Sequence, residues 1–410
     1  MSTLEGVSVA LGITGSIAAV KTVELAHELR RRGAEVRAVM TDGARGIVHP
    51  WAVEFATDGP VVTELTGGIE HVELCGVDGW ADVYLIAPAT ANTVGKIAAA
   101  VDDTSVTTTA TTALGAGVPV VIAPAMHEPM YDHPGVLEAI ERVESWGVEF
   151  VDPRIEEGKA KIATEEAVCA VTARAAGDRP LAGQHVVVTA GATAEAIDPV
   201  RVLTSRSSGR MGRAIARACY VRGADVTLVH GPVGPHRVDR PSAPAEGAVP
   251  YADLRPVESA GEMLETALEV CTGADALVSA AAIGDYTADP SDEKLRSGDA
   301  RTLDLEPTAK LVDEVRERNP DLAMVGFKAE TSDDETAMIE AARSLLERVD
   351  LAFAVANDAS VMGADETSAL LVHAEDVARY VGDKAGLADE IATALAVVVG
   401  GSRTDDQIDG

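Results

Sequence analysis

The alternation of apolar and polar segments is clearest from residue 7 to residue 41. An apolar run at 7–11 leads into Gly12-Ile13-Thr14-Gly15-Ser16, and an amphipathic segment then extends to a stop at Gly33. A second apolar run occupies 36–40 and ends at Thr41. This order predicts a strand, a tight turn, a helix and a second strand. The two strands should be parallel, with a right-handed crossover.

The turn after the first strand brings backbone N–H groups and hydroxyls to a helix N-terminus, where a phosphate can bind. Gly12 and Gly15 stand three residues apart, without the third glycine of the dinucleotide fingerprint. The turn therefore favours a mononucleotide phosphate.

Further apolar runs in the first half predict strands at 80–88, 118–123 and 148–151, with helices after residue 93 and at 135–146. Small or polar residues follow the carboxyl ends of these strands, at 12–16, 41, 88–92 and 126–131. In open α/β sheets that edge holds the ligand.

A similar unit begins after a Gly, Asp and Pro linker at 175–181. We predict a strand with its glycine turn at 184–193, strands at 224–230, 276–282, 324–327 and 351–355, helices at 206–222 and 333–348, and an exposed loop at 233–250. The fold class is α/β, with two doubly wound, Rossmann-like parallel-sheet domains. Their expected extents are 1–178 and 179–400, with an acidic tail at 401–410.

Composition adds an unusual charge balance. The net charge is −32 over 410 residues, and only eight of the 34 basic residues are lysines. Acid is spread throughout the chain, which indicates adaptation to high salt. Such a surface disfavours binding to nucleic acid or to an anionic membrane.

Four cysteines lie far apart, with no C-x-x-C pair, so neither a zinc site nor a disulfide framework is indicated. No segment has a signal-peptide layout, and no apolar run reaches about 18 residues. We expect a cytoplasmic protein.

Serines and glycines gather beside three arginines near residue 206. Serine caps ordinary helices, so a plain helix start is the alternative to an anion site. Clustered arginines in so acidic a chain favour the anion site. The residues are Arg206, Ser207, Ser208, Gly209, Arg210, Gly212 and Arg213.

Other candidates stand alone in the sequence. Asp285 follows a predicted strand and suits a ribose, a base or a metal, although a solvated turn aspartate is the plainer reading. Lys294 and Lys310 are two of few lysines, and a surface role is their default. His71 and His127 are candidates for acid–base chemistry, His127 being the stronger because it lies on the ligand edge.

Together these segments resemble one family across nearly the whole chain. It is the bifunctional enzyme of coenzyme A biosynthesis, phosphopantothenoylcysteine decarboxylase fused to phosphopantothenate–cysteine ligase. The motifs in the first half are Gly12 to Ala19, His71-Val72-Glu73-Leu74, Ala87-Pro88-Ala89-Thr90-Ala91-Asn92 and Pro124 to Tyr131. Those in the second half are Ser207 to Gly212, Ala281 to Tyr286 and Val325 to Thr331.

The resemblance implies that the first domain has the homo-oligomeric fold of flavin-dependent cysteine decarboxylases and binds FMN. In enzymes of that family FMN oxidises the cysteine thiol of the substrate, carbon dioxide leaves, and the flavin returns the electrons. The matching cofactor-binding positions are Gly12, Thr14, Gly15, Ser16, Thr41, Pro88, Ala89, Thr90, Asn92, Thr107 and Met126.

The resemblance also implies catalytic positions in this domain. His71 matches the active-site histidine, and His127 falls where bacterial members carry an asparagine that grips the substrate carboxylate. The substrate-covering flap matches residues 156–162, which lack the cysteine that reprotonates the intermediate. Lys159 or Lys161 is the candidate donor, since Cys169 lies several residues later.

For the second domain the resemblance implies ligation of cysteine to 4′-phosphopantothenate through an acyl-cytidylate. CTP is the bacterial nucleotide, and ATP is not excluded. Mg²⁺ would neutralise the triphosphate, with Asp285 as its ligand. Ser205 stands where relatives often carry an asparagine that handles the acyl intermediate. The nucleotide-binding positions are Gly191, Ser207, Gly209, Gly212, Ser279, Ala280, Ala281, Asp285, Lys294, Thr308, Ala309, Lys310, Leu311, Phe327 and Arg343.

Two other functions stay open. The first half would act on a different cysteine-containing substrate, or the chain would be a flavin-binding regulatory protein with a degenerate ligase domain. The partners implied are small molecules only, 4′-phosphopantothenate, cysteine and CTP, in a homo-oligomer built from trimers and dimers, up to a dodecamer.

Overall fold

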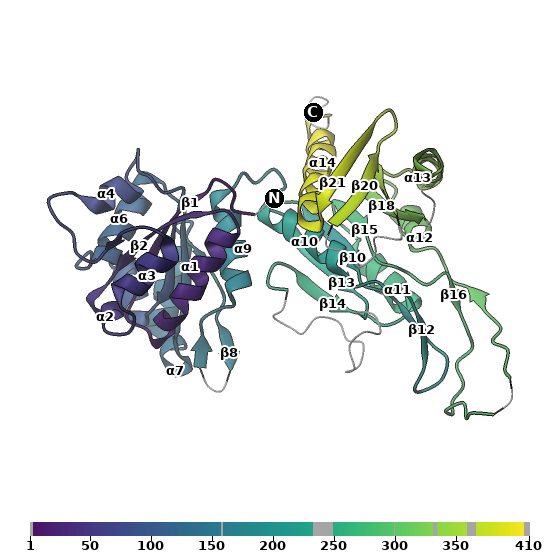
Figure 1. The fold of residues 1–410 in the computed structure, drawn as a ribbon, viewed down its shortest axis with the longest axis horizontal. Coiled ribbons are helices and arrows are strands. Elements are labelled where there is room, and N and C mark those ends of the chain that lie inside the picture. The colour runs from purple at the N-terminus through teal and green to yellow at the C-terminus, as the bar shows by residue number, and fades with distance from the viewer. Residues whose placement is uncertain are drawn as a thin grey trace. The chain divides into compact units, whose positions relative to one another are not determined.

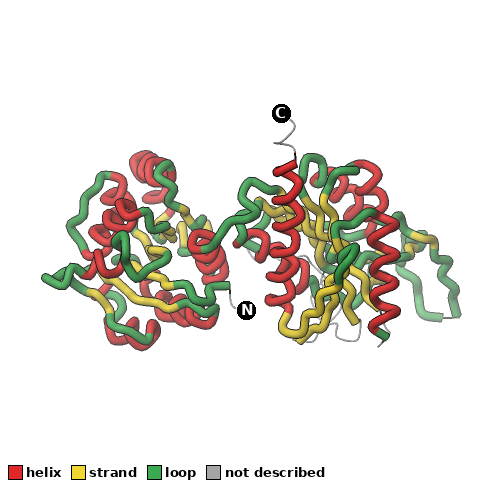
Figure 2. The backbone as a smooth tube through the Cα atoms, turned by 90° about the horizontal axis from the view of Figure 1, so that it is seen from above, coloured by secondary structure: helices red, strands yellow, loops and turns green. Residues whose placement is uncertain are grey.

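The computed structural model describes residues 3–156, 159–232, 249–298, 300–330, 334–358 and 366–405. The chain divides into two compact units, Ser2–Asp178 and Arg179–Gly410, the second also counting Met1. Each unit is a sheet flanked by helices (Figure 1 and Figure 2). None of the described helices is both long and apolar enough to cross a membrane.

The first unit is built on a six-stranded parallel sheet in the order β3-β2-β1-β4-β5-β7. The predicted opening unit is confirmed, because β1 pairs in parallel with β2 from Ser8↔Glu35 to Ile13↔Met40. Every residue of β4 is buried, as expected of a strand covered on both faces. The strands are β1 Ser8–Ile13, β2 Glu35–Met40, β3 Val61–Val62, β4 Val83–Ala89, β5 Val120–Pro124 and β7 Glu149–Phe150.

Helices follow the strand ends, and threonine hydroxyls cap several of them. Thr41, Thr90, Thr104 and Thr164 each accept a backbone N–H at the start of a helix. The helices of this unit are η1 Ile17–Lys21, α1 Thr22–Arg31, α2 Asp42–Arg45, α3 Pro50–Thr57, α4 Glu70–Cys75, α5 Ala91–Ala98, α6 Ser105–Ala116, α7 Glu128–Tyr131, α8 Pro134–Glu144 and α9 Glu165–Ala176.

The predicted flap forms part of a small antiparallel sheet. Strands β8 (Arg154–Glu156) and β9 (Lys159–Lys161) form a hairpin, and β9 pairs with β6 (Met126–His127). Glu157 and Gly158 of the predicted flap lie outside the described residues. The pairing His127↔Lys159 brings the flap strand onto the segment that carries His127.

The second unit is built on an eight-stranded sheet in the order β14-β13-β10-β15-β18-β19-β20-β21. It is parallel up to β19, as predicted, and an antiparallel hairpin extends one edge. The hairpin was not predicted. The strands are β10 His185–Ala190, β13 Asp225–His230, β14 Asp253–Pro256, β15 Ala276–Ser279, β18 Ala323–Glu330, β19 Phe353–Asp358, β20 Glu366–Val372 and β21 Val377–Asp383.

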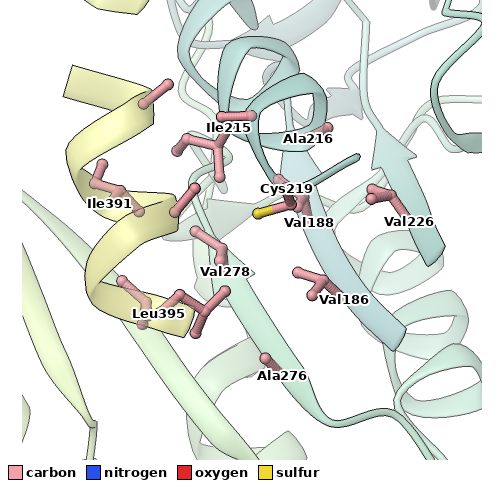
Figure 3. Packing of buried hydrophobic residues seen from close by; sticks show 14 of the residues in the cluster. Val186, Val188, Ile215, Ala216, Cys219, Val226, Ala276, Val278, Ile391 and Leu395 are labelled. Carbon is pink, nitrogen blue, oxygen red and sulfur yellow. The ribbon is translucent and has the colours of Figure 1, made fainter. Parts of the chain in front are cut away.

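Two hydrophobic clusters fill the two faces of this sheet. On one face Ile215 and Cys219 of α10 and Ile391 and Leu395 of α14 pack against strand residues such as Val188 (Figure 3). The helices are α10 Arg210–Val221, α11 Ala260–Val270, α12 Leu311–Arg318, α13 Glu335–Val349 and α14 Lys384–Asp405. Short pairs, β11 Ala194–Ala196 with β12 Val202–Thr204 and β16 Tyr286–Thr287 with β17 Glu306–Pro307, lie outside the main sheet.

Some segments differ from the sequence-based expectations. The expected strand at 276–282 ends at Ser279. Helix α14 continues to Asp405 through the expected tail, and residues 406–410 lie outside the described part. Residues 233–248 of the expected exposed loop also lie outside it, while Val249 at its end is 4% exposed and packs into the core.

Candidate functional site

A cavity of about 700 Å³ lies at the carboxyl edge of the first sheet, lined by the loops after β1, β2 and β4 and by the start of α6. The predicted residues that line it are Thr14, Gly15, Thr41, Thr90, Asn92 and Thr107. The sheet topology explains this grouping, because the carboxyl ends of parallel strands meet at one edge.

The threonine hydroxyls at this cavity hold the loops together. Thr14 Oγ1 donates to the carbonyl of Pro88 at 2.8 Å and accepts from the N–H of Thr90 at 3.1 Å, which ties the β1 loop to the β4 loop. Thr41 and Thr90 cap α2 and α5, and Thr107 forms a capping box with Thr104. The predicted hydroxyls therefore shape the cavity wall.

Backbone groups of the first glycine turn remain open for a ligand. In the described part of the chain, the N–H groups of Gly15 and Ile17 donate no hydrogen bond. A Cβ on Gly15 would lie 3.1 Å from the Cα of Gly43, so the turn lies close against the loop after β2. Such free N–H groups at a helix start suit a phosphate.

A second cavity, of about 490 Å³, adjoins the first, and Gly15, Thr90 and Met130 line both. The predicted residues Ser16, Met126, His127 and Lys161 meet here. Apolar walls from Ile17 and the two methionines stand beside the cations of Lys21, Arg154 and Lys161. This combination suits a small molecule with an apolar body and an anionic end.

Other predicted residues of the first unit lie away from these cavities. Gly12 and Pro88 line neither of them, and Ala89 is fully buried. His71 lies on α4, where its Nδ1 is buried and has no hydrogen-bond partner among the described residues. His71 lines neither cavity of its own chain.

The second unit has a cavity of about 160 Å³ at the start of α10. The predicted residues Ser207, Gly209, Gly212, Ala280, Ala281 and Phe327 line it, together with Arg206 and Arg210. A Cβ on Gly212 would lie 2.5 Å from the Cβ of Ala190, so glycine lets α10 start directly against β10. The serine and glycine residues predicted to hold a nucleotide phosphate thus line one cavity.

The sequence analysis missed Asn357, Thr367 and Lys384, which also line this cavity. They come from β19, β20 and the first turn of α14. No local motif marks them, because only the tertiary pairing of these elements brings them to α10. The scarcity of lysine, which singled out Lys294 and Lys310, was the one signal in the sequence that could have singled out Lys384 as well.

Asp285, Thr308 and Lys310 form a separate cluster near the β16–β17 pair. Lys310 Nζ donates to Asp285 Oδ1 at 2.5 Å, and the Thr308 N–H donates to the Asp285 carbonyl at 3.0 Å. Ala309 lies between them in the chain. None of these residues lines the cavity at α10.

The remaining predicted residues of this unit have different surroundings. Leu311 is 3% exposed and belongs to the core, Arg343 is exposed on α13, and Ser279 is buried at the end of β15. Lys294 precedes Leu295, whose N–H donates to Asp198 at 3.0 Å. Ser205 Oγ is buried with no partner among the described residues.

The described part of the chain contains no cluster of three or more His, Cys, Asp or Glu side chains that would hold a metal ion. Asp285 is the predicted metal ligand, and its carboxylate is 72% exposed and pairs with Lys310. It would supply one ligand, which is common for Mg²⁺ bound mainly through phosphates.

Comparisons with known proteins agree with the two units. A family described as "Flavoprotein" matches residues 1–177, and "DNA/pantothenate metabolism flavoprotein C-terminal domain" matches 181–398. The coenzyme A biosynthesis bifunctional protein CoaBC of Thermococcus kodakarensis is 48% identical over 375 residues, 90% of this chain and 89% of that protein. The CoaBC protein of Bacillus subtilis is 36% identical over 373 residues, 87% of each chain.

A solved structure, the C-terminal domain of a coenzyme A biosynthesis bifunctional protein CoaBC, is 27% identical with a TM-score of 0.44, covering 54% of this chain and 98% of that one. The family matches make the chain a flavoprotein domain followed by a pantothenate-metabolism domain. Given its similarity to relatives over nearly its full length, the chain belongs to the family of bifunctional coenzyme A biosynthesis proteins. The predicted resemblance is confirmed.

Proposed function

We propose that the chain catalyses two consecutive steps of coenzyme A biosynthesis in the cytoplasm. The second unit ligates cysteine to 4′-phosphopantothenate at the expense of CTP, through an acyl-cytidylate. The first unit decarboxylates the product to 4′-phosphopantetheine. The observation that carries the proposal is that both family domains occur in one chain and that each has a cavity lined by its own motif residues.

The cavities of the first unit fit FMN. The N–H groups of Gly15 and Ile17 suit its phosphate. In the larger cavity, the side chains of Asn92 and Thr41 would contact the polyol chain. When bound, FMN would supply the oxidation of the substrate thiol and the return of the electrons after carbon dioxide leaves. The adjoining apolar cavity gives the substrate access to the same turn.

The chain's own groups would bind the substrate and move its protons. His127 would donate a hydrogen bond to the substrate carboxylate, and Arg154 would add positive charge in the same cavity. Lys161 would return a proton to the intermediate, since it lines the cavity from the flap strand β9. His71 would act as the active-site histidine.

The position of His71 supports assembly of several copies of the chain into an oligomer. Because it lines no cavity of its own chain, a second copy would bring it to the flavin, at a boundary between subunits. Ile17, Trp51 and Phe55 are 78%, 75% and 77% exposed in the isolated chain, and burial of such large side chains favours association. Trimers of the first unit, joined by dimers of the second, follow the family pattern. A monomer by light scattering in molar salt would contradict this assembly.

In the second unit, the start of α10 would hold the nucleotide phosphates through Ser207, Gly209 and Gly212. Lys384 would add a cation from α14. Asp285, Lys294 and Lys310 would contact the rest of the nucleotide together with Mg²⁺, and Ser205 would donate to the acyl intermediate. Each of these roles can be tested by substituting the residue.

The test measures the two reactions separately. Purified protein should be yellow, release pyrophosphate with CTP, 4′-phosphopantothenate and cysteine, and release carbon dioxide from synthetic phosphopantothenoylcysteine. His71→Asn should abolish decarboxylation and leave ligation unchanged. His133→Asn is the matched control, because asparagine keeps the helix cap that His133 gives to Gly135. Colourless protein that is inert in both assays overturns the proposal. Protein that ligates cysteine but releases no carbon dioxide from phosphopantothenoylcysteine favours a different cysteine-containing substrate for the first unit.

A further inference from the structure

Behind the predicted nucleotide loop lies a hydrogen-bonded pair that none of the family motifs includes. Arg213, in the first turn of α10, places Nη1 2.8 Å from Nε2 of His230, the last residue of β13. The other ring nitrogen, Nδ1, lies 2.5 Å from the carbonyl oxygen of Gly231. Neither residue lines the cavity, so both stand behind its wall.

The partners determine the protonation of the ring. Arginine can only donate and a carbonyl can only accept, so Nε2 accepts from Arg213 while Nδ1 carries the proton and donates to Gly231. The imidazole is therefore neutral. Full burial of the ring agrees with this state, since burial lowers the pKa of His230 to about 4.

The pair touches both glycine turns of this unit. A Cβ on Gly209 would lie 2.7 Å from Nε2 of His230 and 2.9 Å from Nη1 of Arg213, and a Cβ on Gly191 would lie 3.1 Å from Cε1 of the same ring. Both glycines have positive φ, +66° and +82°. The turns that follow β10 and precede α10 thus pack directly on His230.

Arg213 also makes a second hydrogen bond, to the serine loop that precedes α10. Its Nη2 donates to the carbonyl of Ser208 at 3.1 Å, so one guanidinium joins the serine loop to the end of β13. Among the described residues, no carboxylate pairs with Arg213, although acidic residues outnumber basic ones by 66 to 34 in the sequence. Its charge is left for an anion bound at the start of α10.

We propose that Arg213 and His230 are positioning residues for the nucleotide phosphates, with neutral His230 orienting Arg213 and Arg213 fixing the serine loop and contributing positive charge behind it. This inference rests on the proposed ligase function. Arg213 already belongs to the anion site expected from the clustered arginines; the inference adds His230 and the way the two residues act together.

The experiment compares full-length variants by KM and kcat for ligation and by the Kd of CTP from calorimetry. Arg213→Met removes the charge and both donors while keeping an apolar stem, and should raise the KM and Kd for CTP about 10- to 100-fold. Arg213→Lys keeps the charge without the two-pronged geometry, so its effect should be smaller. His230→Gln keeps an acceptor for Arg213 and should rescue most of the affinity lost in His230→Leu.

Two controls separate positioning from a general loss of structure. Arg222→Gln removes a guanidinium from the other end of α10, where Arg222 pairs with Asp389, and should leave the KM for CTP unchanged. Carbon dioxide release from phosphopantothenoylcysteine should be unchanged in every variant, and the KM for cysteine should move by less than about threefold.

The outcomes distinguish this inference from the function on which it rests. A KM and a Kd for CTP within about twofold of wild type in Arg213→Met overturn the positioning role. An equal rise in the KM values for CTP and cysteine overturns it as well, because it indicates general loosening of the domain. If wild-type protein binds CTP without ligating cysteine, the proposed function is overturned, and the Kd of CTP in the Arg213 and His230 variants still tests the positioning role. If wild-type protein binds no CTP, the proposed function and the positioning role are both overturned.

Discussion

The hydroxyl of Tyr84 occupies the space that a side chain on Gly12 would need, since a Cβ there would lie 2.5 Å from the Tyr84 oxygen. Tyr84 is fully buried, and its hydroxyl donates to the carbonyl of Val106 at 3.0 Å. The two residues lie on neighbouring strands, β1 and β4, which pair in parallel. Gly12 thus gives room to a core tyrosine, a role separate from the cofactor contact that the resemblance implies for it.

We therefore expect Gly12→Ala to destabilise the first unit by about 1–3 kcal/mol through overpacking. Tyr84→Phe should cost about 1 kcal/mol through its lost hydrogen bond. The double variant should be less destabilised than the sum, because the oxygen that the new methyl group meets is gone. Tryptophan fluorescence in urea reports on this unit alone, since Trp51, Trp80 and Trp146 all lie within it. Additivity within about 0.5 kcal/mol would contradict the steric account.

His230 predicts a pH dependence of stability in the second unit. Burial, followed by the charge of Arg213, lowers the pKa of His230 from 6.5 to about 4, and the bond to Gly231 opposes this only in part. The unfolded chain binds the proton below about pH 6.5 and the folded chain only below about 4, so stability should fall as the pH drops through that window. The loss should reach up to about 3 kcal/mol.

Hydrogen exchange measured by mass spectrometry on peptides from α10 and β13 follows this loss, since the second unit has no tryptophan. Carboxylates titrate in the same range, so the informative quantity is the difference between wild type and His230→Gln. The variant should show a flatter dependence between pH 4 and 6.5. Parallel curves would show that His230 is not the titrating group.

Much of the fold follows from the spacing of apolar runs. The order of apolar run at 7–11, glycine turn, amphipathic segment and apolar run at 36–40 predicted β1, the helix and β2. Two short buried runs joined in this way leave few other arrangements. The edge hairpin β20–β21 was not predicted. In β21 the alternation gives only half-buried and exposed positions. It pairs with β20, and β20 joins the sheet by pairing with β19, a contact that exists only once the sheet forms.

The sites were predicted in part for a related reason. Residues next to a strand end, such as Thr14 after β1 and Ala280 after β15, reach a cavity because topology places every carboxyl end of the parallel strands at one edge. For the threonine hydroxyls in these loops the sequence analysis predicted cofactor contacts, and it did not predict their roles as helix caps and loop ties. Lys384 at the cavity and the contact between Arg213 and His230 depend on packing between distant elements, so no local pattern could reveal them.

Asp198 predicts a specific change in protease sensitivity. Its buried carboxylate accepts the N–H groups of Val200 and Arg201 at 2.8 Å each and that of Leu295 at 3.0 Å. Burial raises its pKa, but these bonds and the Arg201 charge outweigh burial and lower it overall. Arg201 also donates to the Leu295 carbonyl at 2.8 Å, so Asp198 and Arg201 anchor the segment that carries Lys294.

Asp198→Ala should release this anchor, and trypsin should then cleave after Lys294 and Arg296 several times faster than in wild type. Asp289→Ala is the control, since Asp289 is an exposed carboxylate in the same segment. Mass spectrometry of early digests assigns the cleavage sites. Equal rates at these two bonds in all three proteins would mean that other contacts hold the segment.

The four cysteines bear on which group returns the proton during decarboxylation. Cys75, Cys169, Cys219 and Cys271 are free and buried, and burial raises the pKa of each thiol to about 12. We expect no reaction with a thiol reagent in native protein and four equivalents after unfolding. Rapid labelling of one thiol in the native protein would contradict the burial.

Cys169 and Lys161 then give opposite expectations for the same reaction. Cys169 lies in α9, fully buried, whereas Lys161 lines the apolar cavity beside His127. Cys169→Ala should therefore leave carbon dioxide release unchanged, while Lys161→Gln should slow turnover by about a hundredfold or more through loss of the acid. Retained yellow absorbance and unchanged ligation exclude unfolding and cofactor loss as causes. If Cys169→Ala abolishes turnover and Lys161→Gln does not, the proton comes from the thiol, and the helix that carries it must open during the reaction.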